Sequence, residues 1–237
     1  MFKRIQALLW LRFQIIFSNK SLLLQILMPF AFAYFYKYIL NMQGGGGKQQ
    51  ALTLLAICLP LSLAMAVGNP ITLILSEEKE KHNLRTLLVS GVKGYEYIVS
   101  TLILPIFFSL IIMVAVPLIL GVSIHYFVQY AFIVFSTSIV IILLYLFLGL
   151  VTRNQVDAQV ISVPAMLIIS FLPMIANFDK NLAKFSDYSF MGLFTQFVTK
   201  WEKFSWGDAL IPSISLAAWI LLLIICNSFI IKKRNTI

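Results

Sequence analysis

Long apolar runs separated by short polar stretches dominate the pattern of this chain. Six runs are long enough to cross a bilayer as helices, which takes about 20 predominantly apolar residues. They cover residues 21–40, 51–75, 97–120, 126–151, 156–176 and 209–231. The pattern predicts an all-α integral membrane protein with six transmembrane helices, folded as a single transmembrane domain over residues 1–237.

Composition and charge agree with a membrane protein and set its orientation. Hydrophobic residues make up 60% of the chain and charged residues only 11%, against about 25% charged residues in soluble domains. The net charge of +9 does not indicate a nucleic-acid partner, because the cations lie between apolar runs rather than on one face. Twelve of the 18 lysines and arginines fall on the side of the two termini. The positive-inside rule therefore predicts a multi-pass protein of the cell membrane with both termini cytoplasmic.

The segments outside the spans have distinct characters. Residues 1–20 are predicted to form an amphipathic helix in the membrane interface, although Arg12 intrudes on an apolar side made by Phe2, Ile5, Leu8, Leu9, Phe13 and Ile16. Residues 21–75 hold the first two spans, residues 97–176 the next three, and residues 209–237 the last span and a basic tail. The external residues 177–208 repeat Phe190, Phe194, Phe197 and Trp201 at helical spacing. This predicts a short helix at the outer interface, where anchoring and gating are equally open roles.

Residues 76–96, between the second and third spans, hold eight of the 27 charged residues of the chain. Charges of alternating sign occupy positions 77–81, and an apolar stripe of Leu84, Leu87 and Leu88 follows at helical spacing. Gly91 is a plausible end of this helix, since glycine tolerates the left-handed geometry found there. One interpretation is a solvated loop with a short interfacial helix. The other, which the rest of the sequence favours, is a cytoplasmic docking surface for a soluble partner.

Candidate chemistry is sparse along the chain. His82 and His125 lie on opposite sides of the predicted membrane, while Cys58 and Cys226 fall inside apolar runs without metal-ligand spacing. Lys48 follows four glycines, but Gln49 stands where a phosphate-binding loop needs Ser or Thr. We therefore predict no catalytic residue, no metal site and no cofactor bound by this chain.

One enzymatic alternative is an intramembrane protease, because Glu77 and Glu78 resemble the start of its acidic-pair motif. This alternative is remote, since His82 stands where that motif has arginine and the later spans contain no histidine to complete a site.

The charged segment resembles a known pattern. Residues 78–92 read E-x-E-K-x-x-L-x-x-L-L-x-S-x-V. They resemble, with one residue fewer before Leu84, the pattern E-x-E-K-x-x-x-L-x-x-L-L-x-S-x-V between the second and third spans of ABC-2 type transporter permeases. His82-Asn83 depart from the glycine-containing step that many members have there. The basic amino-terminal helix, the six spans with both ends inside, the polar entry into the fifth span and the aromatic stretch before the last span extend the resemblance over most of the chain.

The resemblance implies a transmembrane subunit of an ATP-binding-cassette exporter. A separate cytoplasmic ATPase subunit would bind ATP and Mg, and a second permease chain, identical or paralogous, would pair with this one. Residues 76–96 would be a coupling helix segment whose contacts with the ATPase come from Glu78, Glu80, Lys81, Leu84, Arg85, Leu87, Leu88 and Val92. Since the spans carry hardly any charge, we expect an apolar or amphipathic substrate such as a peptide, an antimicrobial or a lipid-like molecule. The alternative from another class is a non-transporting assembly or immunity factor that docks a cytoplasmic partner.

Overall fold

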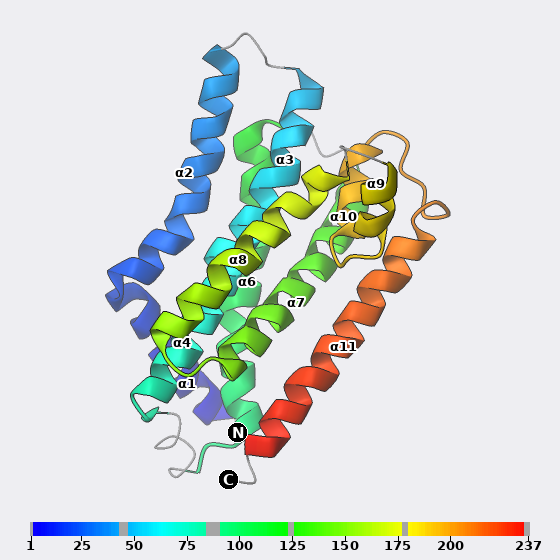
Figure 1. The fold of residues 1–237 in the computed structure, drawn as a ribbon. Coiled ribbons are helices and arrows are strands. Elements are labelled where there is room, and N and C mark those ends of the chain that lie inside the picture. Colours follow the sequence, from blue (N-terminus) through cyan, green and yellow to red (C-terminus); the bar gives the residue numbers. More distant parts are fainter. Residues whose placement is uncertain (1, 43–46, 84–90, 123–125, 177–179, 235–237) are drawn as a thin grey trace.

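A computed structural model describes residues 2–42, 47–83, 91–122, 126–176 and 180–234, and every regular element in these ranges is a helix (Figure 1). Six helical stretches are long and apolar enough to cross a membrane: Lys20–Ile39, Gln49–Glu80, Gly94–Leu120, Phe127–Val151, Gln155–Ile175 and Leu210–Lys232. The all-helical fold and the six predicted spans are confirmed. Their bounds differ from the predicted ones by a few residues, except that the second span runs five residues further, to Glu80.

The elements in chain order are α1 (Phe2–Ser18), α2 (Lys20–Met42), α3 (Lys48–Leu63), η1 (Ala64–Gly68), α4 (Asn69–Glu80), α6 (Gly94–Leu120), α7 (Phe127–Val151), α8 (Gln155–Ile175), α9 (Lys180–Asp187), α10 (Gly192–Thr199) and α11 (Leu210–Arg234). The start of α1 and the end of α11 lie at the same end of the bundle, the lower end in Figure 1, which we call the basal end. The opposite, distal end carries α9 and α10.

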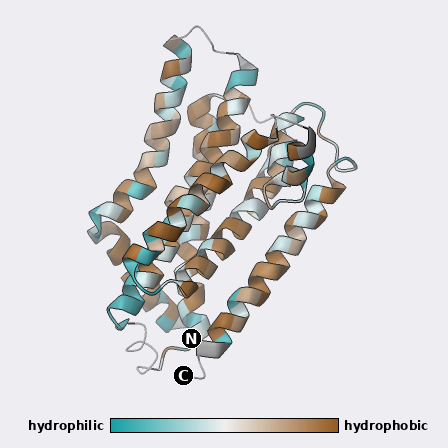
Figure 2. Ribbon diagram, viewed as in Figure 1, coloured by the Kyte–Doolittle hydropathy of each residue, from teal (hydrophilic) through white to brown (hydrophobic). Residues whose placement is uncertain are grey.

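The second span and α7 form the centre of the bundle. In the most apolar part of the second span 67% of the residues are buried, against 17% in α11. Helix α7 packs against α4, α6, α8, α10 and α11. Many apolar side chains of the outer helices are exposed, among them Leu24 and Phe35 in α2 and Leu221 and Ile225 in α11. Both helices contain many hydrophobic residues, coloured brown in Figure 2. In a membrane this outer surface contacts lipid.

The second span is one continuous helix with a widened turn in its middle. The π-helical turn η1 joins α3 to α4 just before Pro70, whose nitrogen has no hydrogen to donate to the preceding turn. Such π-bulges are typical sites of helix bending and of function. At Gly68, the last residue of η1, the ring of Tyr145 in α7 lies so close that a Cβ atom would be 2.3 Å from its Cδ2. Only glycine permits this approach of α7.

Helix α1 packs along α6 with two apolar sides rather than one. Leu8, Arg12 and Ile16, spaced by four residues, face the protein and are buried. A ridge of Trp10, Phe13 and Phe17 is exposed on another side, with ring centroids 6.0 and 4.3 Å apart in succession. Leu8 and Phe13, which the sequence pattern placed on one broad apolar side, thus differ: Leu8 is buried in the protein and Phe13 is exposed.

The predicted external aromatic helix is present as α10, but its aromatic side chains pack into the bundle. Phe194 and Phe197 are fully buried, and α10 contacts α3, α7, α8 and α11. The ring of Phe197 lies 6.2 Å from that of Tyr130 in α7 and 5.0 Å from that of Trp201. The expectation of aromatic side chains at a lipid-facing interface is therefore wrong for these residues, which close the distal end of the helix bundle.

Candidate functional site

The charged end of α4, which we call the α4 tip (residues 76–80), contacts four other helices at the basal end. Helical spacing places the side chains of consecutive residues about 100° apart around the axis. Glu78, Lys79 and Glu80 thus point in three directions, and each meets a different partner. The exposed pair of Glu77 and Lys81, with 2.5 Å between Oε1 and Nζ, lies on the remaining side.

Glu78 points inward and binds the buried side of α1. One carboxylate oxygen accepts a hydrogen bond from Nη1 of Arg12, and the other accepts one from the hydroxyl of Tyr97 in α6. Nη2 of Arg12 also donates to Oγ1 of Thr101 at 3.1 Å, and its Cζ lies 4.9 Å from the centre of the Tyr97 ring. The relative exposure of Arg12 is 2% and that of Glu78 is 4%, so this ion pair is buried.

Two effects act on the charge of Arg12. Burial by itself lowers the pKa of Arg12, but attraction to Tyr97 and Glu78 outweighs it and raises the pKa above its usual value. Arg12 therefore remains a cation at every physiological pH. Removing one partner of such a pair leaves the other charge buried without compensation, which costs about 3–5 kcal/mol in proteins.

Lys79 points toward the end of α7. Its ammonium group donates to the carbonyl oxygens of Leu150 at 2.8 Å and Thr152 at 2.6 Å, and also to that of Gly149. The last carbonyl groups of a helix have no partner within the helix and carry a partial negative charge. Lys79 supplies both the missing donors and the opposite charge.

Glu80 and Ser76 complete the contact with the turn between α7 and α8. Oε2 of Glu80 accepts a hydrogen bond from the backbone amide of Gln155 at 3.0 Å. That amide belongs to the first turn of α8, where a negative charge is favourable. Oγ of Ser76 lies 2.6 Å from Oγ1 of Thr152. Lys79 and Glu80 thus bind the end of one helix and the start of the next with the charge that each requires.

The contact between α4 and α7 continues from the tip toward the middle of the second span. Oγ1 of Thr72 donates to the carbonyl oxygen of Tyr145 at 2.8 Å. At Gly149 a Cβ atom would lie 3.0 Å from the Cα atom of Thr72, so the two helices almost touch. We call this line of contacts the α4–α7 seam. Its second-span side has Gly68 at the end of η1 and Thr72, Ser76 and Lys79 in α4; its other side has Tyr145 and Gly149 in α7 and Thr152 just after it.

Helix α1 has a second anchor close to the start of α6. Nη1 of Arg4 donates to the carbonyl oxygen of Gly91 at 2.8 Å and lies 4.0 Å from Oε2 of Glu96. Gly91 has a φ of 86°, the left-handed geometry that the sequence predicts for it. Oε2 of Glu96 accepts from the amide of Lys93 at 3.0 Å, which caps α6. The two anchors of α1 thus bind residues on either side of residues 84–90: Arg12 binds Glu78 before them, and Arg4 binds Gly91 after them.

The predicted partner-contact residues fall into three groups. Leu84, Arg85, Leu87 and Leu88 lie outside the described residues, so their role stays a prediction. Glu80 and Lys81 are exposed at the basal end, although Glu80 also holds α8. Glu78 is enclosed by α1 and α6 and offers almost no surface to a partner. Val92 is half-buried against the core, and its contact with the ATPase stays a prediction.

Sequence reasoning did not assign roles to Arg12, Tyr97, Thr101 or Lys79. A signal for Arg12 existed, because one cation on the apolar side of an amphipathic helix calls for a buried acidic partner. For Lys79 and the end of α7 no such signal exists, because the carbonyl groups that it binds belong to the backbone.

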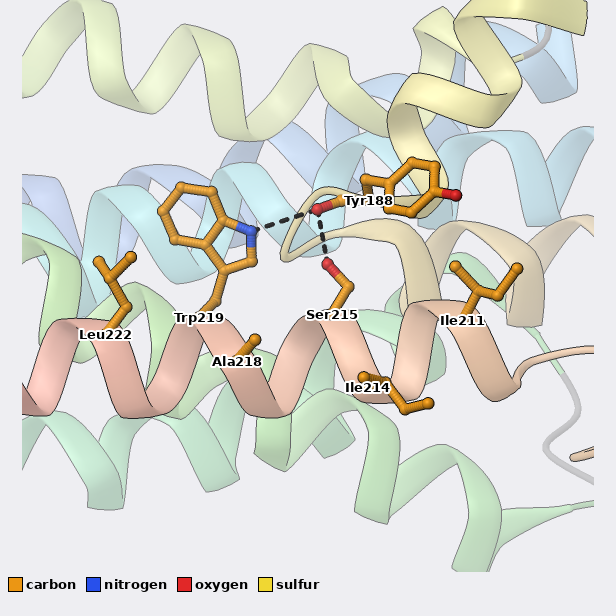
Figure 3. A pocket seen from close by; sticks show the side chains of 7 residues that line it. All are labelled: Tyr188, Ile211, Ile214, Ser215, Ala218, Trp219 and Leu222. Carbon is orange, nitrogen blue, oxygen red and sulfur yellow. Dashed lines mark hydrogen bonds between the residues drawn. The ribbon is translucent and has the colours of Figure 1, made fainter.

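At the distal end, a groove lies between α11 and the connection from α9 to α10. The carbonyl oxygen of Tyr188 accepts hydrogen bonds from Oγ of Ser215 at 2.5 Å and from Nε1 of Trp219 at 3.3 Å (Figure 3). The groove has a volume of about 380 Å³, and its remaining lining is apolar: Ile211, Ile214, Ala218 and Leu222. It offers no titratable side chain besides Tyr188, so it is a surface for apolar contact rather than for catalysis.

A metal centre finds no support in the part of the chain that the structure describes, where no three His, Cys, Asp or Glu side chains gather. In the same residues the buried charged side chains are Arg12, Glu78 and Glu96, all at the basal end. The described middle and distal parts of the bundle are thus lined by neutral side chains wherever they are buried.

Comparison with known proteins gives one match. The sequence profile described as ABC-2 family transporter protein matches residues 39–229. This stretch contains the α4 tip, the α4–α7 seam and the second to fifth spans in full. No curated protein and no solved structure matches the chain.

Proposed function

Because the chain belongs to the ABC-2 family of transporter proteins, we propose that it is the permease of an exporter driven by a separate cytoplasmic ATPase subunit. Members of this family form the transmembrane part of ATP-binding-cassette transporters and are not themselves the ATPase. In the proposed complex, residues 84–90 contact the ATPase, and a second permease chain completes the transport unit.

The α4 tip is the observation that carries this proposal. A subunit without an ATPase must receive mechanical work from outside, and the receiving element must be joined firmly to the spans. Three residues separate the α4 tip from residues 84–90, and the tip binds α1, α6, α7 and α8 through charged side chains. A displacement at residues 84–90 would therefore reach four helices at once, and short linkers between rigid helices pass such displacements on.

The neutral interior supports an apolar or amphipathic substrate. Charged side chains within a membrane bundle are expensive and usually mark the path of a charged substrate or ion. The buried charges of the described residues lie at the basal end, within the polar cluster around Arg12 or at the start of α6. A peptide, antimicrobial or lipid-like molecule fits such a path better than a polyanionic polymer.

Reconstitution with the ATPase tests the proposal. We expect ATP-dependent movement of an amphipathic peptide or lipid probe in vesicles that contain the chain and its ATPase. The variants Leu84→Asp and Leu88→Asp should abolish both association with the ATPase and transport. Leu182→Asp is a matched control, because it makes the same substitution at an exposed site in α9 at the distal end, outside the six spans and away from the proposed contact. Association without ATP-dependent movement would instead identify a docking or assembly factor.

The orientation has its own test. With Cys58→Ala and Cys226→Ser as background, the variant Lys81→Cys should resist an impermeant thiol reagent in intact cells and react once the membrane is opened. Reaction in intact cells would place the α4 tip outside and refute the proposed contact with a cytoplasmic ATPase.

A further inference from the structure

The α4 tip and the turn between α7 and α8 are held together by charges of the correct sign at two helix ends. Lys79 donates to the last carbonyl groups of α7, and Glu80 accepts from the first amide of α8. No glycine follows the end of α7, where Thr152 is extended with a φ of −64° and a ψ of 151°. The usual glycine cap of a helix end is therefore missing, and Lys79 takes its place.

We propose that Lys79 and Glu80 are positioning residues that make the α4 tip and the α7–α8 turn one mechanical unit. When the ATPase displaces residues 84–90, α7 and α8 then move together with α4 rather than sliding past it. This inference rests on the proposed function for the source of the displacement, while the attachment itself follows from the contacts of the chain.

The α4–α7 seam shows how far such a displacement would travel. Its contacts run without interruption from Lys79 to Gly68, a distance of about 16 Å along the axis of α4. The seam ends at the π-helical turn η1, where the Tyr145 ring fills the space left by the missing side chain of Gly68. A pull on the α4 tip would therefore reach the widened turn in the middle of the second span, together with the α7 segment packed against it.

Charge attraction at both helix ends explains why the attachment can be firm and still reversible. Hydrogen bonds to charged groups are stronger than neutral ones, and the three carbonyl oxygens around Lys79 converge on one ammonium group. Lys20, exposed at the start of α2 and outside the predicted ATPase contact, is the natural comparison. A general effect of lowering the positive charge of this region would appear in variants of both lysines; a positioning role would appear only for Lys79.

Substitutions of Lys79 and of a control lysine test the proposal. In the background Cys58→Ala and Cys226→Ser, the variant Lys79→Gln should keep ATPase binding and ATP hydrolysis but lose transport per ATP hydrolysed by about tenfold, the ratio expected for one lost charge-assisted contact. Lys79→Arg should retain most of the coupling, and Lys20→Gln should behave as the parent.

The rescue uses the close pair at the seam. Oγ of Ser76 and Oγ1 of Thr152 are 2.6 Å apart, so Ser76→Cys with Thr152→Cys is placed to form a disulfide. Added to Lys79→Gln, this pair should restore coupling when oxidised and lose it again when reduced. Normal coupling in Lys79→Gln, or a disulfide that forms without restoring coupling, overturns the proposal.

The same variants separate this inference from the proposed function. If the parent protein shows no ATP-dependent transport, the proposed function fails, and the attachment is judged by cross-linking alone. Lys79→Gln should then slow oxidation of the engineered cysteine pair by about tenfold, whereas Lys20→Gln should not. An equal oxidation rate in both variants would show that Lys79 does not hold α4 to α7.

Discussion

The buried pair of Arg12 and Glu78 gives the sharpest stability prediction. Replacing Arg12 with methionine keeps an unbranched apolar stem but leaves the Glu78 carboxylate enclosed without its cation. The loss of a charged hydrogen bond and of a partner for a buried charge together cost about 3–5 kcal/mol. For a chain of this size, that corresponds to a fall in melting temperature on the order of 10 °C.

A double-mutant cycle separates the pair from its surroundings. The variants are Arg12→Met, Glu78→Met and the combination of both, measured by thermal unfolding in one detergent with intrinsic tryptophan fluorescence. Each single variant should be strongly destabilised. The double variant should recover most of the loss, because replacing a buried ion pair with apolar side chains of similar volume is often neutral or stabilising. The expected coupling energy is therefore several kcal/mol, well above the few tenths found for independent sites.

Two results would contradict this reasoning. A single variant Arg12→Met that melts within about 2 °C of the parent would mean that Arg12 and Glu78 do not face each other in a dry environment. A double variant whose destabilisation equals the sum of the two single losses would mean that the charges act on different partners. Gln14→Met, an exposed change on the same helix, controls for the effect of methionine itself.

Three further predictions concern local geometry. Gly68→Ala should destabilise the protein by about 1–3 kcal/mol through overpacking, and Tyr145→Ala should relieve part of that loss in the double variant, measured by thermal unfolding; an additive double variant would refute the close approach. His82, with a φ of 57°, should favour glycine over alanine by about 1 kcal/mol, so His82→Gly should melt above His82→Ala, and the reverse order would contradict the left-handed end of α4. Phe197→Ala should cost about 3–5 kcal/mol, and limited proteolysis from the distal side should accelerate; unchanged melting would mean that α10 does not pack into the bundle.

The spans were predictable because hydrocarbon imposes one rule on every residue that crosses it. An apolar run of about 20 residues has few alternatives to a membrane helix. Because the number of spans is even, the chain starts and ends on the same side, and both termini lie at the basal end. The left-handed backbone geometry of Gly91 was equally predictable, because glycine has no Cβ atom to oppose it. These features depend on local sequence and on the solvent, so a single sequence carries them.

The contacts of the α4 tip were not predictable in the same way. The sequence indicated that the charges at positions 77–81 would meet a partner, and the expected partner was another protein. In the structure Glu78 meets Arg12, 66 residues earlier, and Lys79 meets the backbone of α7, about 70 residues later. Backbone carbonyl groups carry no sequence signal, and a buried arginine is recognised only when its acidic partner is known. The aromatic residues of α10 were predicted at the membrane interface but are buried in the bundle. The reason is related, since helical spacing identifies the aromatic face of a helix but not what packs against it.

The second span, from Gln49 to Glu80, holds 32 residues and measures about 48 Å as a helix. The hydrocarbon region of a typical bilayer is only about 30 Å thick, so part of this helix must project into the aqueous layer or tilt. Acyl chain length would thereby set how much of the charged end stands clear of the lipid, and a thicker host membrane would draw Lys79 and Glu80 toward hydrocarbon. Lipid composition is thus expected to tune the strength of the link between the two sides of this protein.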